Sequence, residues 1–136
     1  MLTDKPQALA VNFDGIPLSI KKIPRWVLWK FVELGSGETK RWAKLPMQPN
    51  HQAASSTDPT TWIDYFTAEQ VYKQGGFDGV GIVFNGDDVI GIDLDDVRSE
   101  DGTLSEFAEN IRANVKGYAE ISPSGTGIKI FTRANL

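Results

Sequence analysis

The chain has 136 residues, of which 40% are hydrophobic and 24% charged; this suits one globular domain with a buried core and argues against wholesale disorder. There is no cysteine, which excludes a disulfide framework, a thiol nucleophile and a metal site with Cys ligands. The formal net charge is -4 and the sequence pI is about 4.9, which argues against a protein that coats nucleic acid by bulk electrostatics.

Residues 1–22 are predicted to be an irregular lead-in, because they show no clear period and contain two prolines and a glycine. The run 26–32 is rich in β-branched and aromatic residues and predicts a buried strand. Glycines at 35–37 supply a turn, and residues 40–45 alternate in polarity, which predicts the return strand of a hairpin. We expect Pro46 to end that strand.

Seven basic residues fall between positions 21 and 44: Lys21, Lys22, Arg25, Lys30, Lys40, Arg41 and Lys44. Two interpretations stay open, a surface that contacts phosphates and an ordinary solvated face, because clustering in sequence need not mean clustering in space.

Helix starts are predicted in the middle of the chain. Asp58 and Pro59 indicate an N-cap followed by proline at the first helical position. Thr67 with Gln70 forms a second N-terminal box, which opens a helix that Gly75 ends.

Two strands follow, at 79–84 and 89–95. The turn between them, at 85–88, begins with Asn-Gly, and this dipeptide between apolar runs predicts a β-hairpin.

The last third predicts one helix and two strands. Thr103 and Glu106 form a capping box, and Gly117 closes the helix. Strands at 118–121 and 127–131 come next. The apolar face of the helix is expected to hold Leu104, Phe107, Ala108, Ile111 and Val115. This order of elements predicts an α+β fold, with a largely antiparallel sheet and helices on one face.

Asp93 and Asp95 are candidate metal ligands. In a strand they point to the same face, with Leu94 on the other and their Cβ atoms about 6–7 Å apart. Their repulsion, roughly 2–3 kcal/mol at an effective dielectric of ~20, would be removed by a divalent cation such as Mg²⁺ or Mn²⁺. The alternative is a pair of acids at a strand end that simply faces water.

The turn at 122–127 is a candidate anion site. Glycines flanking small hydroxyl residues allow backbone N–H groups to converge on an anion, and Lys129 could reach the same phosphate. The alternative is an ordinary hairpin turn.

Taken together, these motifs resemble the N-terminal catalytic domain of phage and plasmid primase-polymerases, in the archaeo-eukaryotic primase superfamily. The matching segments are 24–29, 44–46, 58–62, 79–84, 91–96 and 118–127. The resemblance covers 23–136 and implies an RRM-like core that extends DNA or RNA from nucleoside triphosphates with Mg²⁺ or Mn²⁺. It also implies a DNA template and primer, a replication helicase domain or protein as partner, and the cytoplasm of a bacterial host. No apolar run is long enough to cross a membrane and no signal pattern begins the chain.

The resemblance also assigns roles. Asp93 and Asp95 match the metal-binding catalytic acids. The residues expected to bind the nucleotide are Ser122, Ser124, Gly125, Gly127, Lys129 and Lys44. We expect Trp26, Trp29 and Trp62 to be packing residues rather than platforms for base stacking.

Two departures from the family pattern matter. Lys129 stands where the commoner pattern has histidine, which preserves phosphate binding but not a role specific to histidine. The family supplies a third carboxylate from a strand beyond this point, so we expect a domain cut before the third acidic motif. An active polymerase, a non-catalytic module that binds nucleotide or single-stranded nucleic acid, and a phage protein-interaction factor on the same scaffold therefore all stay open.

Overall fold

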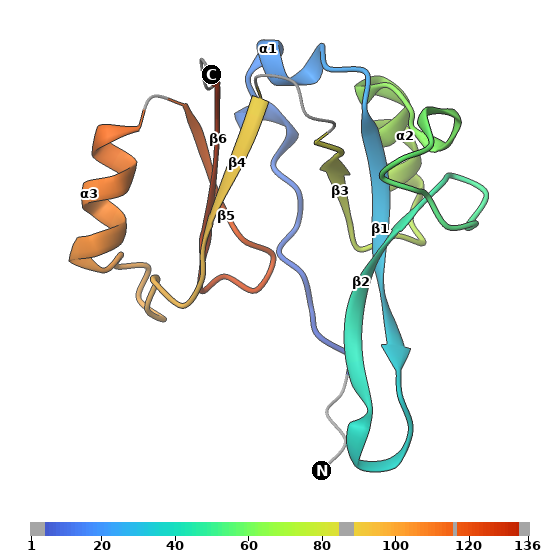
Figure 1. Ribbon diagram of the computed structural model, residues 1–136, viewed down its shortest axis with the longest axis horizontal. Coiled ribbons are helices and arrows are strands. Elements are labelled where there is room, and N and C mark those ends of the chain that lie inside the picture. The colour runs from blue at the N-terminus through green and yellow to red at the C-terminus, as the bar shows by residue number, and fades with distance from the viewer. Residues whose placement is uncertain (1–4, 85–88, 116, 134–136) are drawn as a thin grey trace. The chain divides into compact units, whose positions relative to one another are not determined.

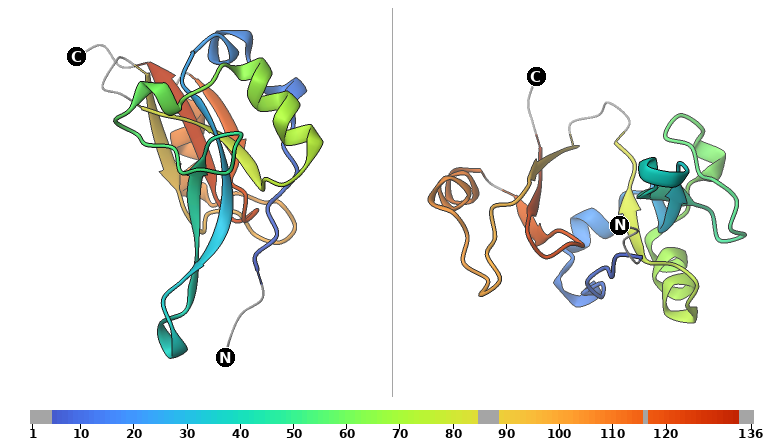
Figure 2. Two further views of the ribbon diagram at one scale, coloured as in Figure 1. Left: turned by 90° about the vertical axis from the view of Figure 1, so that its right-hand side faces the viewer. Right: turned by 90° about the horizontal axis from the view of Figure 1, so that it is seen from below.

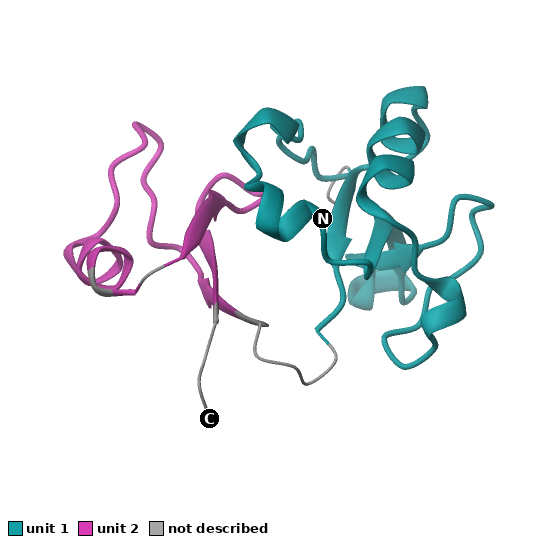
Figure 3. Ribbon diagram, turned by 90° about the horizontal axis from the view of Figure 1, so that it is seen from above, with its two compact units in different colours: residues 1–85 teal, residues 86–136 magenta. Residues whose placement is uncertain are grey.

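The computed structural model describes residues 5–84, 89–115 and 117–133 (Figure 1). The chain divides into two compact units, residues 1–85 and residues 86–136 (Figure 3). Each unit contains a three-stranded antiparallel sheet, with strand order β2-β1-β3 in the first and β4-β6-β5 in the second. The predicted α+β class with antiparallel pairing is confirmed.

The first unit contains η1 (Phe13–Gly15), α1 (Leu18–Lys21), β1 (Trp26–Leu34), η2 (Gly37–Thr39), β2 (Arg41–Met47), η3 (Pro59–Thr61), α2 (Tyr65–Gln74) and β3 (Gly79–Ile82). The predicted hairpin is confirmed, since β1 and β2 pair antiparallel. The prediction that Pro46 ends the second strand is wrong. Proline is tolerated there because β2 is an edge strand, and the Pro46 carbonyl accepts a bond from Ala54.

The core of the first unit lies between its sheet and α2. Trp26 and Leu28 point to the helix side of β1 and are 3% and 0% exposed, and Tyr65 on α2 is 2% exposed. The Trp26 and Tyr65 rings meet edge to face, with centroids 5.2 Å apart. Phe13, from the segment expected to be irregular, packs against Tyr65 as well. This segment contains two short helical turns, each with one buried apolar residue, Phe13 and Ile20.

One predicted helix start in this unit is confirmed and one is wrong. The Asp58 carboxylate accepts a bond from the backbone N–H of Thr60, with Pro59 at the first helical position. α2 begins at Tyr65, so its N-cap is Asp64 and not Thr67. The hydroxyl of Thr67 instead donates to the Asp64 carboxylate.

The second unit contains β4 (Val89–Leu94), α3 (Glu106–Asn114), β5 (Tyr118–Ile121) and β6 (Ile128–Arg133). Figure 1 shows α3 packed on one face of its sheet. Ala108, Ile128 and Ile130 are at most 5% exposed and form the core with the half-buried apolar residues around them. Phe107 was expected on this apolar face, but it is 63% exposed.

The cap predictions for α3 need correction. Its N-cap is Ser105, whose hydroxyl accepts a bond from Ala108 N–H, so Thr103 lies two residues too early. Gly117 does not close the helix, which ends at Asn114. A Cβ at Gly117 would lie 2.2 Å from the Phe131 carbonyl oxygen, so glycine is needed there for close approach to β6.

The predicted hairpin of residues 79–84 and 89–95 is wrong. β3 pairs with β1, whereas β4 pairs with β6, so the two strands belong to different sheets. The Asn-Gly turn at 85–88 lies outside the described residues. Within the described residues, no helix is both long and apolar enough to span a membrane.

Candidate functional site

The sheet face opposite α3 in the second unit carries three charged side chains in a row. Ile92, Leu94, Ile128 and Ile130 contribute to the core under α3, so the alternate residues of these strands face away from the helix. The strand register places Lys129 of β6 directly opposite Asp93 of β4 on one side and Glu120 of β5 on the other. A lysine therefore separates two carboxylates.

Asp93 and Lys129 form an ion pair, with Nζ 3.7 Å from Oδ1. The Asp93 side chain is 65% exposed and that of Lys129 is 30% exposed, so solvent screening keeps the pair below about 1 kcal/mol. Asp95 follows the last residue of β4, and the chain turns at Asp96, whose φ is 53°. In the described part of the chain, no three His, Cys, Asp or Glu side chains lie close enough together to hold a metal ion. The metal site at Asp93 and Asp95 stays a prediction.

Glu120 was not predicted as a site residue. Its carboxylate accepts a hydrogen bond from the Tyr118 hydroxyl at 3.0 Å. Burial raises the pKa of the Glu120 carboxyl, and the charge of Asp93 adds to that rise, although the Tyr118 bond and the charge of Lys129 act against it. The hairpin register could have found this residue, since a turn at 122–127 pairs position 120 with position 129.

The turn between β5 and β6 is held by its own backbone. Ser122 N–H donates to the Gly127 carbonyl, and Gly125 N–H donates to the Ser122 carbonyl, each at 2.9 Å. The Gly127 N–H donates to the Ser122 hydroxyl at 3.0 Å. These backbone N–H groups are used inside the turn, so its hydroxyl groups are the better candidates for contacting an anion.

Those hydroxyls form a chain. Ser122 Oγ lies 3.0 Å from Ser124 Oγ, which lies 2.9 Å from Thr126 Oγ1. Ser124 and Thr126 are exposed. Hydroxyl hydrogens rotate, so the row can donate to an incoming oxygen without movement of the backbone.

Two glycines shape this turn, and Gly127 also lies against the end of β4. Gly125 has a φ of 82°, a left-handed conformation that favours glycine. A Cβ at Gly127 would lie 2.6 Å from the Leu94 carbonyl oxygen and 3.4 Å from Cα of Asp95. The structure therefore brings the hydroxyl turn directly against the backbone that carries Asp95.

Arg98 is a second residue that was not predicted. Its Nη1 donates to the Gly125 carbonyl at 2.8 Å. The backbone N–H groups of Val97 and Arg98 donate to the Thr126 carbonyl at 2.9 and 2.8 Å. Arg98 thus fastens the segment after Asp95 to the turn and places a positive charge beside it. No sequence pattern signals this role.

Of the residues predicted to bind the nucleotide, Lys44 lies in the first unit and the others lie in the second. It lies on β2 of the first unit, where its Nζ is 5.2 Å from the centroid of the Trp29 ring. Its role at the nucleotide stays a prediction.

No protein-family model matches the chain. Over 121 residues, which are 87% of the chain, the sequence is 34% identical to the DNA primase-polymerase of Nitratiruptor phage NrS-1. The chain is a homologue of a phage primase-polymerase. The predicted resemblance to primase-polymerases is thereby confirmed, and the matched region spans 16% of the length of the phage protein.

Proposed function

We propose that the second unit is the nucleotide-binding part of a primase-polymerase, which transfers nucleotides from nucleoside triphosphates with the help of a divalent metal ion. The observation that carries this proposal is the fit of Gly127 against the end of β4. This contact brings the end of β4, with Asp95, next to the turn at 122–127 with its serine and threonine hydroxyls. A metal-bound triphosphate needs carboxylates for the metal and donors for the phosphates at one place.

The donor set suits the proposed ion. Asp93 and Asp95 offer hard carboxylate oxygens, which Mg²⁺ and Mn²⁺ prefer. Both side chains are exposed, so neither must be moved out of a core to bind. When bound, such an ion would activate the attacking 3′-hydroxyl and stabilise the pyrophosphate leaving group.

Lys129 and the turn are proposed to hold the triphosphate. Lys129 already neutralises part of the charge of Asp93, and its long side chain can turn from that carboxylate to a phosphate oxygen. Glu120 lies opposite Lys129 on the other side, where its charge interacts with that of the ammonium, and we assign it a positioning role. Ser122 and Ser124 would donate hydroxyl hydrogens to the phosphates, and Arg98 keeps the turn in place.

The wider assignments are proposals too. The phage relative is a DNA primase-polymerase by its name, and we extend from it a DNA template and primer, a replication helicase as partner, and a role in phage or mobile-element replication in the cytoplasm of a bacterial host. The alternative is a non-catalytic nucleotide-binding module, which would bind the triphosphate without extending a primer.

The first test is calorimetric titration of a deoxynucleoside triphosphate in the presence of Mn²⁺. We expect the double variant Asp93→Asn/Asp95→Asn to bind at least about tenfold more weakly, and native binding to depend on the metal. Asp96→Asn is the matched control, because asparagine tolerates the left-handed backbone at that position. If the native chain does not bind at millimolar concentrations, the proposal is wrong. Primer extension then separates the enzyme from the non-catalytic module.

A further inference from the structure

The first unit contains a two-stranded ribbon with one aromatic face. β3 pairs with β1 only at Trp26–Trp29, whereas β2 pairs with β1 as far as Leu34. β1 and β2 therefore continue past the end of β3 as a ribbon, which Figures 1 and 2 show.

Alternation decides which side chains share each face of this ribbon. Trp26 and Leu28 lie on the side that α2 covers, so Trp29 and Phe31 lie on the opposite side. Lys44 is directly opposite Phe31, and two residues further along the ribbon Trp42 is opposite Glu33. We call Trp29, Phe31, Trp42 and Lys44 the aromatic face.

The contacts within the aromatic face bring a lysine onto an indole ring, and Glu33 lies on the same side of the ribbon. The rings of Trp29 and Phe31 meet edge to face with centroids 5.1 Å apart, and Lys44 Nζ lies over the Trp29 ring. A Cβ at Gly79 would lie 2.4 Å from the Trp29 ring, so the indole lies directly on the backbone of β3. The three rings are half-buried and Lys44 is exposed.

The charge of this part of the chain suits an anionic partner. Residues 21–47 contain seven Lys and Arg but two Glu, although the whole chain has a net charge of -4. Aromatic rings combined with basic side chains are what proteins use to bind single strands, because every base can stack on a ring while cations follow the phosphates.

We infer that the aromatic face binds single-stranded nucleic acid, with bases stacked on Trp42 and Trp29 and a phosphate at Lys44. Its use as a template-binding surface rests on the proposed function, whereas binding itself does not. This departs from the expectation that Trp29 is only a packing residue.

The test is fluorescence anisotropy with a labelled thymidine oligonucleotide, without nucleotide or divalent metal. We expect Trp42→Leu to weaken binding about 5- to 150-fold, the usual effect of losing one stacking ring. Phe66→Leu is its control, since Phe66 is an aromatic residue on α2 that is 66% exposed. Thermal melting followed by circular dichroism verifies that each variant folds.

A second pair of variants separates the aromatic face from bulk charge. Lys44→Gln should lower the slope of log affinity against log salt by about 0.7, whereas Arg41→Gln, on the opposite face of the same strand, should leave affinity within about twofold. Equal losses in both variants, or no binding by the native chain, would overturn the inference.

The acidic variant Asp93→Asn/Asp95→Asn should bind the oligonucleotide as the native chain does. Oligonucleotide binding without nucleotide binding would support the aromatic face and reject the proposed nucleotide site. Nucleotide binding without oligonucleotide binding would do the reverse.

Discussion

Lys129 has a carboxylate on each side, Asp93 on β4 and Glu120 on β5. We expect Lys129→Gln to weaken triphosphate binding about tenfold or more, because a charge-assisted hydrogen bond to phosphate is lost. Binding of Mn²⁺ alone should not weaken, since the lysine no longer competes for Asp93. Calorimetry with each ligand separately measures the two effects. Unchanged triphosphate affinity with a lower melting temperature would mean that Lys129 is only structural.

The hydrogen bonds of the Asp101 carboxylate should make the stability of the fold depend on pH in the acid range. Its carboxylate accepts bonds from the Ser99 hydroxyl and the Thr103 N–H, and these bonds lower its pKa from 3.8 to about 2. A folded pKa below the unfolded value contributes stability above pH 4 that is lost as the pH falls towards 2. Asp101→Asn should therefore flatten the fall in unfolding free energy over this window. Urea denaturation at several pH values measures it, and parallel curves for both proteins would contradict the assignment.

Single-residue signals were predictable where the partner is close in sequence. Asp58 caps the N–H of Thr60 as expected. Thr67 failed as an N-cap because Asp64, three residues earlier, takes that position. Glu120 could have been found by counting the hairpin register from the turn at 122–127. Arg98 depends on a contact with Gly125, 27 residues away, so no local pattern marks it.

At the scale of elements, the turn at 122–127 and the end of β4 act as one piece. Gly127→Ala would place a methyl group 2.6 Å from the Leu94 carbonyl oxygen, which the two backbones can avoid only by separating. We expect a loss of stability of about 1–3 kcal/mol and weaker triphosphate binding.

Gly37→Ala is the control for this substitution. Its φ of 58° strains alanine, but no atom lies within 4 Å of the added Cβ, so it should cost about 1–2 kcal/mol and leave nucleotide affinity unchanged. Equal effects on nucleotide affinity in the two variants would show that the contact with β4 is not the cause.

Strands and helices were predicted better than their pairing. β-rich composition placed β1, alternation placed β2, and β5 and β6 also lie where they were predicted. The hairpin between β3 and β4 failed because Asn-Gly is a local preference. Pairing with β1 and β6, which are distant in sequence, decided where those strands went.

At the scale of the whole molecule, each unit has its own sheet and its own core. All four tryptophans of the chain lie in residues 1–85, so tryptophan fluorescence reports on the first unit alone. Ile130 is 1% exposed in the second unit, and Ile130→Ala should destabilise that unit by about 2–5 kcal/mol. We expect the circular-dichroism transition to shift while the fluorescence midpoint stays.

Leu28→Ala, at a residue that is 0% exposed in the first unit, is the matched variant and should lower the fluorescence midpoint. If Ile130→Ala lowers both transitions together, the units unfold as one cooperative body and the prediction is wrong.

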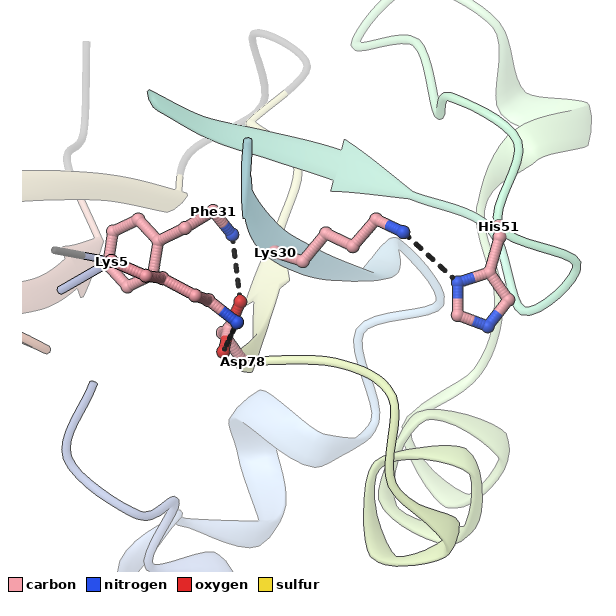
Figure 4. A network of polar contacts seen from close by, with 5 residues as sticks. All are labelled: Lys5, Lys30, Phe31, His51 and Asp78. Atoms are coloured by element: carbon pink, nitrogen blue, oxygen red, sulfur yellow. Dashed lines mark hydrogen bonds and ion pairs between the residues drawn. The ribbon is translucent and has the colours of Figure 1, made fainter. Parts of the chain in front are cut away.

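Asp78, the residue before β3, occupies a backbone donor at the edge of the ribbon. The Asp78 carboxylate accepts a bond from Phe31 N–H at 2.8 Å and pairs with Lys5 at 3.0 Å, as Figure 4 shows. It occupies the backbone donor that a strand from another molecule would use to extend the sheet. Asp78→Ala should expose that donor, and light scattering should then detect growing aggregates at protein concentrations where the native chain stays monodisperse.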